Sequence, residues 1–143
     1  MNVATLLKVK GRAVATVGAD TLVQDVAGKL AAKRIGAMVI VGKGGALAGI
    51  VSERDIIRAL AARGAAALAL SVDEIMTRDV VTCQEDDTID SVMAKMTAGR
   101  FRHLPVVEDG SLVGLVSIGD VVKHHIAEVE LEASALKSYL VAG

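Results

Sequence analysis

The sequence of 143 residues has almost no aromatic side chains, one cysteine and one proline. One Phe and one Tyr, with no Trp, are too few for a platform on which nucleic-acid bases stack. The net charge of −1, from 16 basic and 17 acidic residues, gives no overall positive field to attract nucleic acid. The lone cysteine, Cys83, excludes an intrachain disulfide and a multi-cysteine zinc site, and we expect it to be buried.

Long apolar runs are also missing. Although 52% of the residues are hydrophobic, no apolar run approaches the length of about 20 residues that is needed to cross a bilayer. Residues 1–5 lack the basic start and long apolar stretch of an export signal. We therefore expect a cytoplasmic protein with no membrane contact, whose apolar side chains are buried in the fold and partly against a partner.

What the sequence does contain is an internal repeat. The segment Ala37–Ile40 recurs as Leu104–Val107, 67 residues later, and GIVSERD at 49–55 recurs as GLVSIGD at 114–120, 65 residues later. A glycine-containing turn that is two residues longer in the first copy accounts for the difference.

Each copy predicts the order strand, helix, strand, strand, helix. One copy of about 60 residues buries too little surface to be stable alone, so we expect the two copies to pack together. The predicted fold is α/β (α+β), with two β-α-β-β-α units packed sheet to sheet about a pseudo-twofold axis. The first strands are expected at 13–17 and 80–83, the first helices after the N-caps Thr21 and Thr88, the hairpins at 38–51 and 104–116, and the second helices from Ser52 and Ser117. The predicted domain boundaries are 1–66, 67–125 and a helical extension at 126–143.

The most informative feature is the Ser-x-x-Asp element at the end of a strand in both copies, Ser52 to Asp55 and Ser117 to Asp120. By itself it is an ordinary helix N-cap with an acidic residue in the first turn. A helix N-terminus also attracts anions, and an ionised aspartate accepts hydrogen bonds from the two hydroxyls of a ribose. The two interpretations are compatible.

The repeat, the element order and these paired motifs resemble a tandem cystathionine-beta-synthase (CBS) domain pair, or Bateman module, over residues 13 to about 125. The segment RFRHLPVVEDGSLVGLVSIGD at 100–120 carries much of the resemblance. The resemblance implies binding of an adenosyl ligand such as AMP, ADP, ATP, NAD(H) or S-adenosylmethionine, no catalysis, and regulation in trans of an unidentified protein.

The resemblance also implies two clefts, each built from the Ser-x-x-Asp element of one copy and strands of the other. The first cleft is predicted to contain Ile50, Ser52, Arg54, Asp55, Thr77, Val81, Thr82, Phe101, Arg102 and His103. The second cleft is predicted to contain Val14, Ala15, Ile35, Gly36, Leu115, Ser117 and Asp120, with Lys10 as a further candidate. Because Gly119 stands where the first cleft has Arg54, we expect the first cleft to hold more phosphates.

Two other functions remain open. A structural dimerisation module with non-functional clefts would need the repeat but not the motifs. A phosphohydrolase would need a general base or a metal site, and the sequence offers neither in a recognisable pattern. His124 and His125 are adjacent on a predicted helix and point in different directions, so no metal site is predicted.

The C-terminal segment has a heptad pattern. Its apolar residues follow one another at alternating steps of four and three: Val122, Ile126, Val129, Ala133, Leu136 and Leu140. We predict a homodimer in which this helix contacts the partner chain. The alternative is a helix that lies against its own domain.

Overall fold

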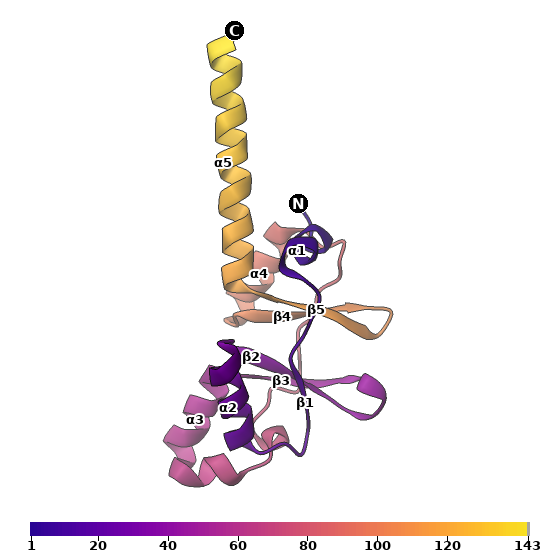
Figure 1. The fold of residues 1–143 in the computed structure, drawn as a ribbon, viewed down its shortest axis with the longest axis vertical. Coiled ribbons are helices and arrows are strands. Elements are labelled where there is room, and N and C mark those ends of the chain that lie inside the picture. The colour runs from indigo at the N-terminus through magenta and orange to yellow at the C-terminus, as the bar shows by residue number, and fades with distance from the viewer. Residues whose placement is uncertain (143) are drawn as a thin grey trace.

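A computed structural model describes residues 1–142 (Figure 1). It is a mixed α/β fold in which the β4–β5 hairpin lies over the β1–β2–β3 sheet, so the predicted sheet-to-sheet arrangement is confirmed. The helices are α1 (Val3–Lys10), α2 (Val23–Lys33), α3 (Glu53–Arg63), α4 (Ile89–Gly99) and α5 (Ile118–Ala142), with short 3-10 turns η1 (Lys43–Gly45), η2 (Gly64–Ala69) and η3 (Val72–Glu74). The strands are β1 (Thr16–Gly18), β2 (Ala37–Val41), β3 (Leu47–Ser52), β4 (His103–Glu108) and β5 (Ser111–Ser117).

The two sheets differ in their first strand. In the first copy β1 pairs in parallel with β2, and β2 pairs antiparallel with β3. The strand predicted at 13–17 thus begins later and is shorter than expected. In the second copy β4 and β5 form an antiparallel pair, and the strand predicted at 80–83 is reduced to one parallel bridge between Cys83 and Val106.

The two copies are offset by 66 residues from α2 to β2 and, correspondingly, from α4 to β4. The predicted offset of 67 is wrong over this part of the repeat. Helices α2 and α4 begin and end 66 residues apart, and the bulges after Ile40 and after Val106 have the same separation. Met38, not Ala37, is therefore the equivalent of Leu104, and the first-copy hairpin is only one residue longer than the second.

The helix N-caps explain this difference. Leu22 rather than Thr21 caps α2, and it makes no side-chain hydrogen bond, whereas the Thr88 side chain accepts a hydrogen bond from Ser91 N at 3.0 Å as predicted. The buried stripe of α2 accordingly begins at Val23, because Leu22 is exposed. Two threonines at similar places in the sequence occupy different positions on their helices.

Each copy completes its core with a segment from outside the copy. The first core contains Val17, Val23, Val26, Leu30, Met38, Ile40, Val51, Ile56 and, from the connection between the copies, Val72. The second core contains Cys83, Ile89, Val92, Met96, Leu104, Val106, Val116, Val121 and, from α1 at the start of the chain, Val3, Leu6 and Leu7. The predicted boundaries at 66 and 125 stay a prediction, but α1 packs with the second copy.

Cys83 is buried in the second core, as predicted, and has no disulfide partner. Burial is the main reason that the pKa of its thiol is raised to about 12, so the side chain is a neutral apolar group at physiological pH.

A glycine in the last strand of each hairpin lets the outside segment lie against the sheet. A Cβ atom at Gly49 would lie 2.6 Å from the sulfur of Met76, and one at Gly114 would lie 2.8 Å from Cδ2 of Leu7. Met76 and Leu7 are thus structural equivalents. The glycines serve tight packing, as their position in a strand suggests.

Helix α5 begins on the second core and then leaves it. Val121 is buried, whereas the C-terminal half projects far from the body of the molecule (Figure 1). No helix among residues 1–142, α5 included, combines the length and the apolar character that a membrane crossing requires.

The packing of α1 predicts a large loss of stability for Leu6→Ala. We expect the free energy of unfolding, measured by urea denaturation, to fall by about 2–5 kcal/mol, because the leucine is fully buried. Val9→Ala on the exposed face of the same helix is the matched control and should change it by less than about 0.5 kcal/mol. Equal losses in the two variants would contradict the role of α1 in the second core.

Candidate functional site

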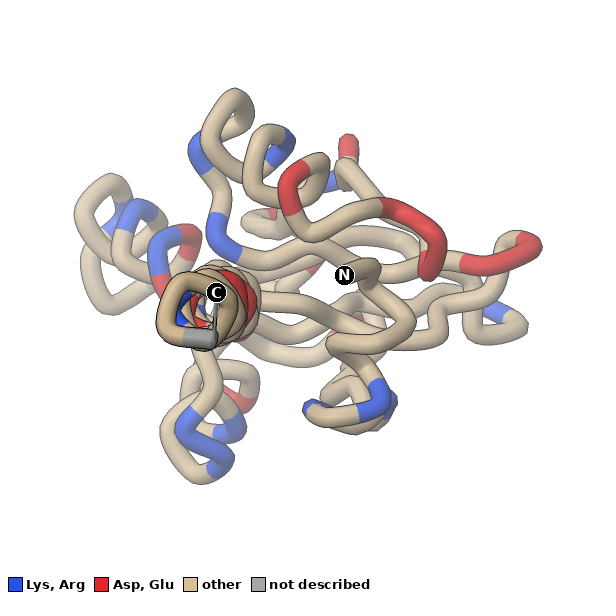
Figure 2. Tube along the Cα trace, turned by 90° about the horizontal axis from the view of Figure 1, so that it is seen from above, with Lys and Arg blue, Asp and Glu red and all other residues tan. Residues whose placement is uncertain are grey.

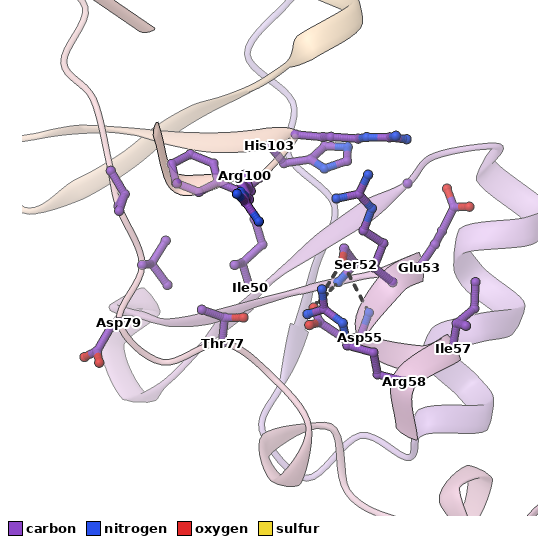
Figure 3. A pocket seen from close by; sticks show the side chains of 17 residues that line it. Ile50, Ser52, Glu53, Asp55, Ile57, Arg58, Thr77, Asp79, Arg100 and His103 are labelled. Atoms are coloured by element: carbon purple, nitrogen blue, oxygen red, sulfur yellow. Dashed lines mark hydrogen bonds between the residues drawn. The ribbon is translucent and has the colours of Figure 1, made fainter. Parts of the chain in front are cut away.

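A cavity of about 500 Å³ lies between the two copies (Figure 3). Four segments line it: the junction of β3 with α3, the chain at 77–81, the junction of α4 with β4, and Gly36 between α2 and β2. Nine of the ten residues predicted for the first cleft are among its lining residues: Ile50, Ser52, Arg54, Asp55, Thr77, Val81, Phe101, Arg102 and His103. Thr82 is the exception, and its carbonyl oxygen accepts a hydrogen bond from Lys95 Nζ at 3.2 Å.

The Ser-x-x-Asp element caps α3 at the edge of this cavity (Figure 3). Ser52 N and Ser52 Oγ donate to Asp55 Oδ2 at 2.8 and 3.1 Å, and Asp55 N donates to Ser52 Oγ at 3.4 Å. The serine hydroxyl is therefore engaged within the cap. Both donations to Asp55 use Oδ2, which leaves Oδ1 as the carboxylate oxygen suited to a ligand hydroxyl.

Four arginines line the cavity together with three carboxylates, Glu53, Asp55 and Asp79, so positive charge is in slight excess. Arg54 and Arg58 come from α3, and Arg100 and Arg102 come from the α4–β4 junction. Across the molecule, Lys and Arg are carried mostly by helices, whereas Asp and Glu lie on both helices and loops, with several of the loop positions at one side of the view (Figure 2). Guanidinium groups of this kind are suited to bind phosphate oxygens.

Sequence reasoning missed Arg58 and Arg100. Arg58 follows Arg54 by four residues, a spacing that places both on one face of a helix, and this signal was available. Arg100 was harder to find, because it ends α4 in the left-handed conformation with φ of 57°. That conformation turns the chain from the helix into the segment that carries Arg102.

His103 is the first residue of β4 and is partly buried against the first copy. A Cβ atom at Gly36 would lie 3.2 Å from its imidazole ring and 2.9 Å from Glu53 Oε1. Burial, aided by the nearby positive charge of Lys10, lowers the pKa of His103, while Glu53 and Asp120 oppose the shift. The arginines, and not this histidine, therefore supply the positive charge of the cavity at neutral pH.

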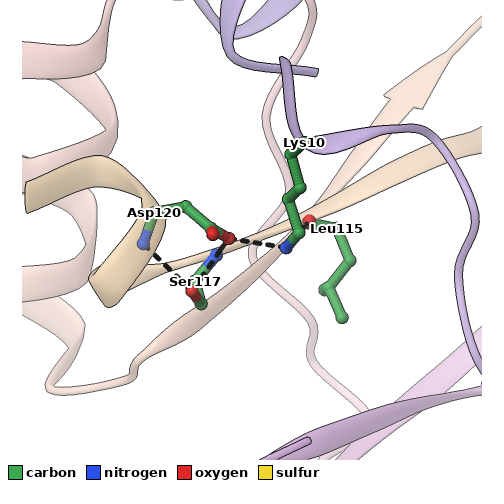
Figure 4. Close-up of polar contacts among 4 residues, drawn as sticks. All are labelled: Lys10, Leu115, Ser117 and Asp120. Carbon is green, nitrogen blue, oxygen red and sulfur yellow. Dashed lines mark hydrogen bonds and ion pairs between the residues drawn. The ribbon is translucent and has the colours of Figure 1, made fainter. Parts of the chain in front are cut away.

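The second cleft is built differently (Figure 4). Ser117 and Asp120 form the same cap, with Ser117 N and Oγ donating to Asp120 Oδ2 at 2.9 and 2.8 Å. Lys10 reaches this cap, since its Nζ donates to Asp120 Oδ2 at 2.5 Å and to the carbonyl oxygen of Leu115 at 2.6 Å. The doubly hydrogen-bonded lysine occupies the mouth of the motif.

The other residues predicted for the second cleft come from the first copy, and their place in that cleft stays a prediction. Val14 and Ala15 line neither the first cavity nor a groove of about 480 Å³ that runs along α2 and α3. Ile35 and Gly36 line that groove, and Gly36 also lines the first cavity. The two clefts are thus equivalent in their caps but not in their walls.

Metal-ligating side chains do not cluster in the described part of the chain. Among residues 1–142, no group of three or more His, Cys, Asp or Glu side chains is arranged to hold a metal ion. His125 instead lies 3.7 Å from Asp90 through Nδ1.

Comparison with known proteins identifies the family. The family model of the CBS domain matches residues 9–62 and 72–126. A curated relative, the mitochondrial CBS domain-containing protein CBSX3 of Arabidopsis thaliana, is 35% identical over 128 residues, which are 87% of this chain and 62% of that protein. A second Arabidopsis relative, CBSCBSPB2, is 31% identical over 129 residues, and the chain spans only 24% of its length.

Solved structures share the fold. The CBS-domain containing protein ATU1752 from Agrobacterium tumefaciens has 51% sequence identity and a TM-score of 0.84, covering 85% of this chain and 91% of that one. The CBS domain pair of MJ0100, in complex with 5′-methylthioadenosine and S-adenosyl-L-methionine, has 29% identity and a TM-score of 0.80, covering 90% and 98%. CBS domain protein PAE2072 from Pyrobaculum aerophilum, complexed with AMP, has 30% identity and a TM-score of 0.75, covering 84% and 89%.

The partly buried position of His103 predicts a pH dependence of stability. The pKa of His103 in the folded protein lies below the ordinary 6.5. Its contribution to the free energy of unfolding is therefore fully present above pH 6.5 and is lost as the pH falls through the pKa of the folded protein. Acidification from pH 7.5 to 5 should therefore lower the thermal midpoint of the wild type more than that of His103→Gln. A difference between the two proteins that stays constant over this range would contradict the assignment.

Proposed function

Because the chain belongs to the CBS domain family, we propose that it binds an adenine nucleotide, AMP, ATP or NAD(H), in the cavity of the first cleft. Binding acts in trans on a partner protein, and the nucleotide is a signal rather than a substrate. The observation that carries the proposal is one cavity that combines an aspartate at a helix N-terminus with four arginines.

The lining of the cavity suits each part of a nucleotide. Ile50, Val81 and Phe101 offer apolar surface to a base, and Asp55 Oδ1 offers an acceptor to the ribose hydroxyls. The N-terminus of α3 and the arginines favour phosphate. The volume of about 500 Å³ lies within the range of ordinary small-molecule pockets.

Similar proteins support the ligand class. The ligands named for MJ0100 and PAE2072 differ in charge and in their groups beyond the ribose, but each contains adenosine. Recognition of adenosine is therefore the common element. The four arginines of this chain favour a ligand that also carries phosphate, because a guanidinium group contacts charge and not the base.

A structural dimerisation module with non-functional clefts is the alternative. It is favoured by the caps, since Ser52 and Asp55 satisfy each other without any ligand. It does not explain the arginines, because capping needs no positive charge beside the helix N-terminus, where the dipole is already positive. The basic cavity thus favours nucleotide binding over a purely structural role.

Asp55→Ala should weaken AMP binding about 10- to 100-fold, the effect of one lost hydrogen bond to a charged group. Asp120→Ala is the matched control, since it removes the same kind of cap from the second cleft, and it should leave the affinity within twofold. Isothermal titration calorimetry measures both. An unchanged affinity in Asp55→Ala would reject the assignment of this carboxylate to the ligand.

We propose further that the chain forms a homodimer through α5. The apolar residues of the heptad are exposed along the projecting helix, among them Ile126, Val129, Leu136 and Leu140. A parallel pair of such helices would place Glu132 of one copy beside Lys137 of the other, which is the favourable charge pairing of coiled coils. A second copy of the chain therefore fits this surface in both apolar pattern and charge.

The test compares two equally drastic substitutions on one helix. Leu136→Asp changes a heptad residue that is 59% exposed, and Leu131→Asp changes an off-heptad residue that is 69% exposed. We expect light scattering to report a dimer for the wild type and for Leu131→Asp, but a monomer for Leu136→Asp. A monomeric wild type would reject the dimer, and a dimeric Leu136→Asp would reject only the role of α5.

A further inference from the structure

The segments that lead into the two copies differ in length by three residues. Leu7 and Met76 are equivalent because each packs on the glycine of a hairpin, and Val17 and Cys83 are equivalent because each pairs in parallel with the central strand. Nine residues lie between Leu7 and Val17 in the first copy, whereas six lie between Met76 and Cys83 in the second. The extra length continues α1 by another turn, to Lys10.

This extra turn changes what covers the last strand of the hairpin. In the first cleft the backbone of Thr77 pairs with Ile50, with Thr77 N donating to Ile50 O at 2.9 Å and Ile50 N donating to Thr77 O at 3.0 Å. In the second cleft Leu115 is the equivalent of Ile50, and its carbonyl oxygen accepts instead from Lys10 Nζ at 2.6 Å. A charged side chain has replaced a backbone amide.

The same ammonium group also reaches the aspartate of the motif. Lys10 Nζ lies 2.5 Å from Asp120 Oδ2, an atom that already accepts from Ser117 N and Ser117 Oγ (Figure 4). The side chains of Lys10 and Asp120 are 32% and 27% exposed, so the pair is shielded from water more than an ordinary surface ion pair.

We propose that Lys10 closes the second cleft, so that each chain binds one adenine nucleotide and not two. The proposal rests on the function proposed for the first cleft. The ammonium group lies at the mouth of the second motif, on Asp120 Oδ2 and Leu115 O, and thus beside Asp120 Oδ1, the carboxylate oxygen that a ligand hydroxyl would need to reach. A nucleotide that enters has to displace a charged group tethered to the chain.

The electrostatics of Asp120 agree with this role. Burial by itself raises the pKa of the carboxyl group, but hydrogen bonds from Lys10 and Ser117 outweigh it, and the net shift is downward. The carboxylate thus stays ionised and paired at neutral pH. Among residues 1–142, Asp55 of the first cleft has no ion pair of this kind, and the Thr77 backbone and the arginines of the cavity border its cap.

The test counts AMP sites per chain by equilibrium dialysis at saturating AMP. We expect one site in the wild type and in Lys10→Arg, which keeps the positive charge. Two sites are expected in Lys10→Met and in Lys10→Gln, which remove the charge at similar length; the glutamine retains a donor for Leu115 O. Adding Asp120→Ala to Lys10→Met should restore a single site. Circular dichroism shows whether each variant is folded.

The outcomes separate the two proposals. A single site in the wild type and in both neutral variants would reject the role of Lys10 but not the function of the first cleft. Two AMP sites in the wild type would also reject the proposal that Lys10 closes the second cleft. If Lys10→Met then lost one of these two sites, Lys10 would be a phosphate ligand instead. No binding by any of these proteins would reject the proposed function and this inference with it.

Discussion

The close contact between a hairpin glycine and a side chain from outside the copy determines how the rest of the structure is arranged. Met76 lies on Gly49 and Leu7 lies on Gly114, at distances that no Cβ atom would permit. Each small core is thereby closed by a segment that also leads to the other half of the molecule. Since a unit of about 60 residues buries too little surface alone, these contacts account for the dependence of each copy on the rest of the chain.

The same contacts explain why the two clefts are unequal. The residues that follow Met76 and Leu7 pass directly over the capped helices, so their length and identity decide what each cleft contains. After Met76 the chain is no longer helical, and the backbone of Thr77 pairs with the hairpin, which leaves the basic cavity. After Leu7 it remains helical and delivers Lys10 to Asp120. Equivalent positions differ too, since Arg54 corresponds to Gly119 and Arg102 to Gly36.

Much of the candidate site could be predicted from the sequence, because its chemistry is concentrated in a short repeated motif. The caps formed by Ser52 with Asp55 and by Ser117 with Asp120 follow from local spacing alone, and both are present. The exact register was harder. The threonines at 21 and 88 suggested an offset of 67, but only hydrogen-bond geometry distinguishes a capping residue from its neighbour.

The sequence by itself determined the repeat, the order of elements, the family and most residues of the first cleft, since these depend on periodicity and on residues close together in the chain. Only the tertiary structure decided that α1 packs with the second copy and that Lys10 lies against Asp120, 110 residues away. Such contacts depend on how far a helix extends before the chain turns. That length is decided by packing against Gly114 and the second core, and neither is visible in the local pattern.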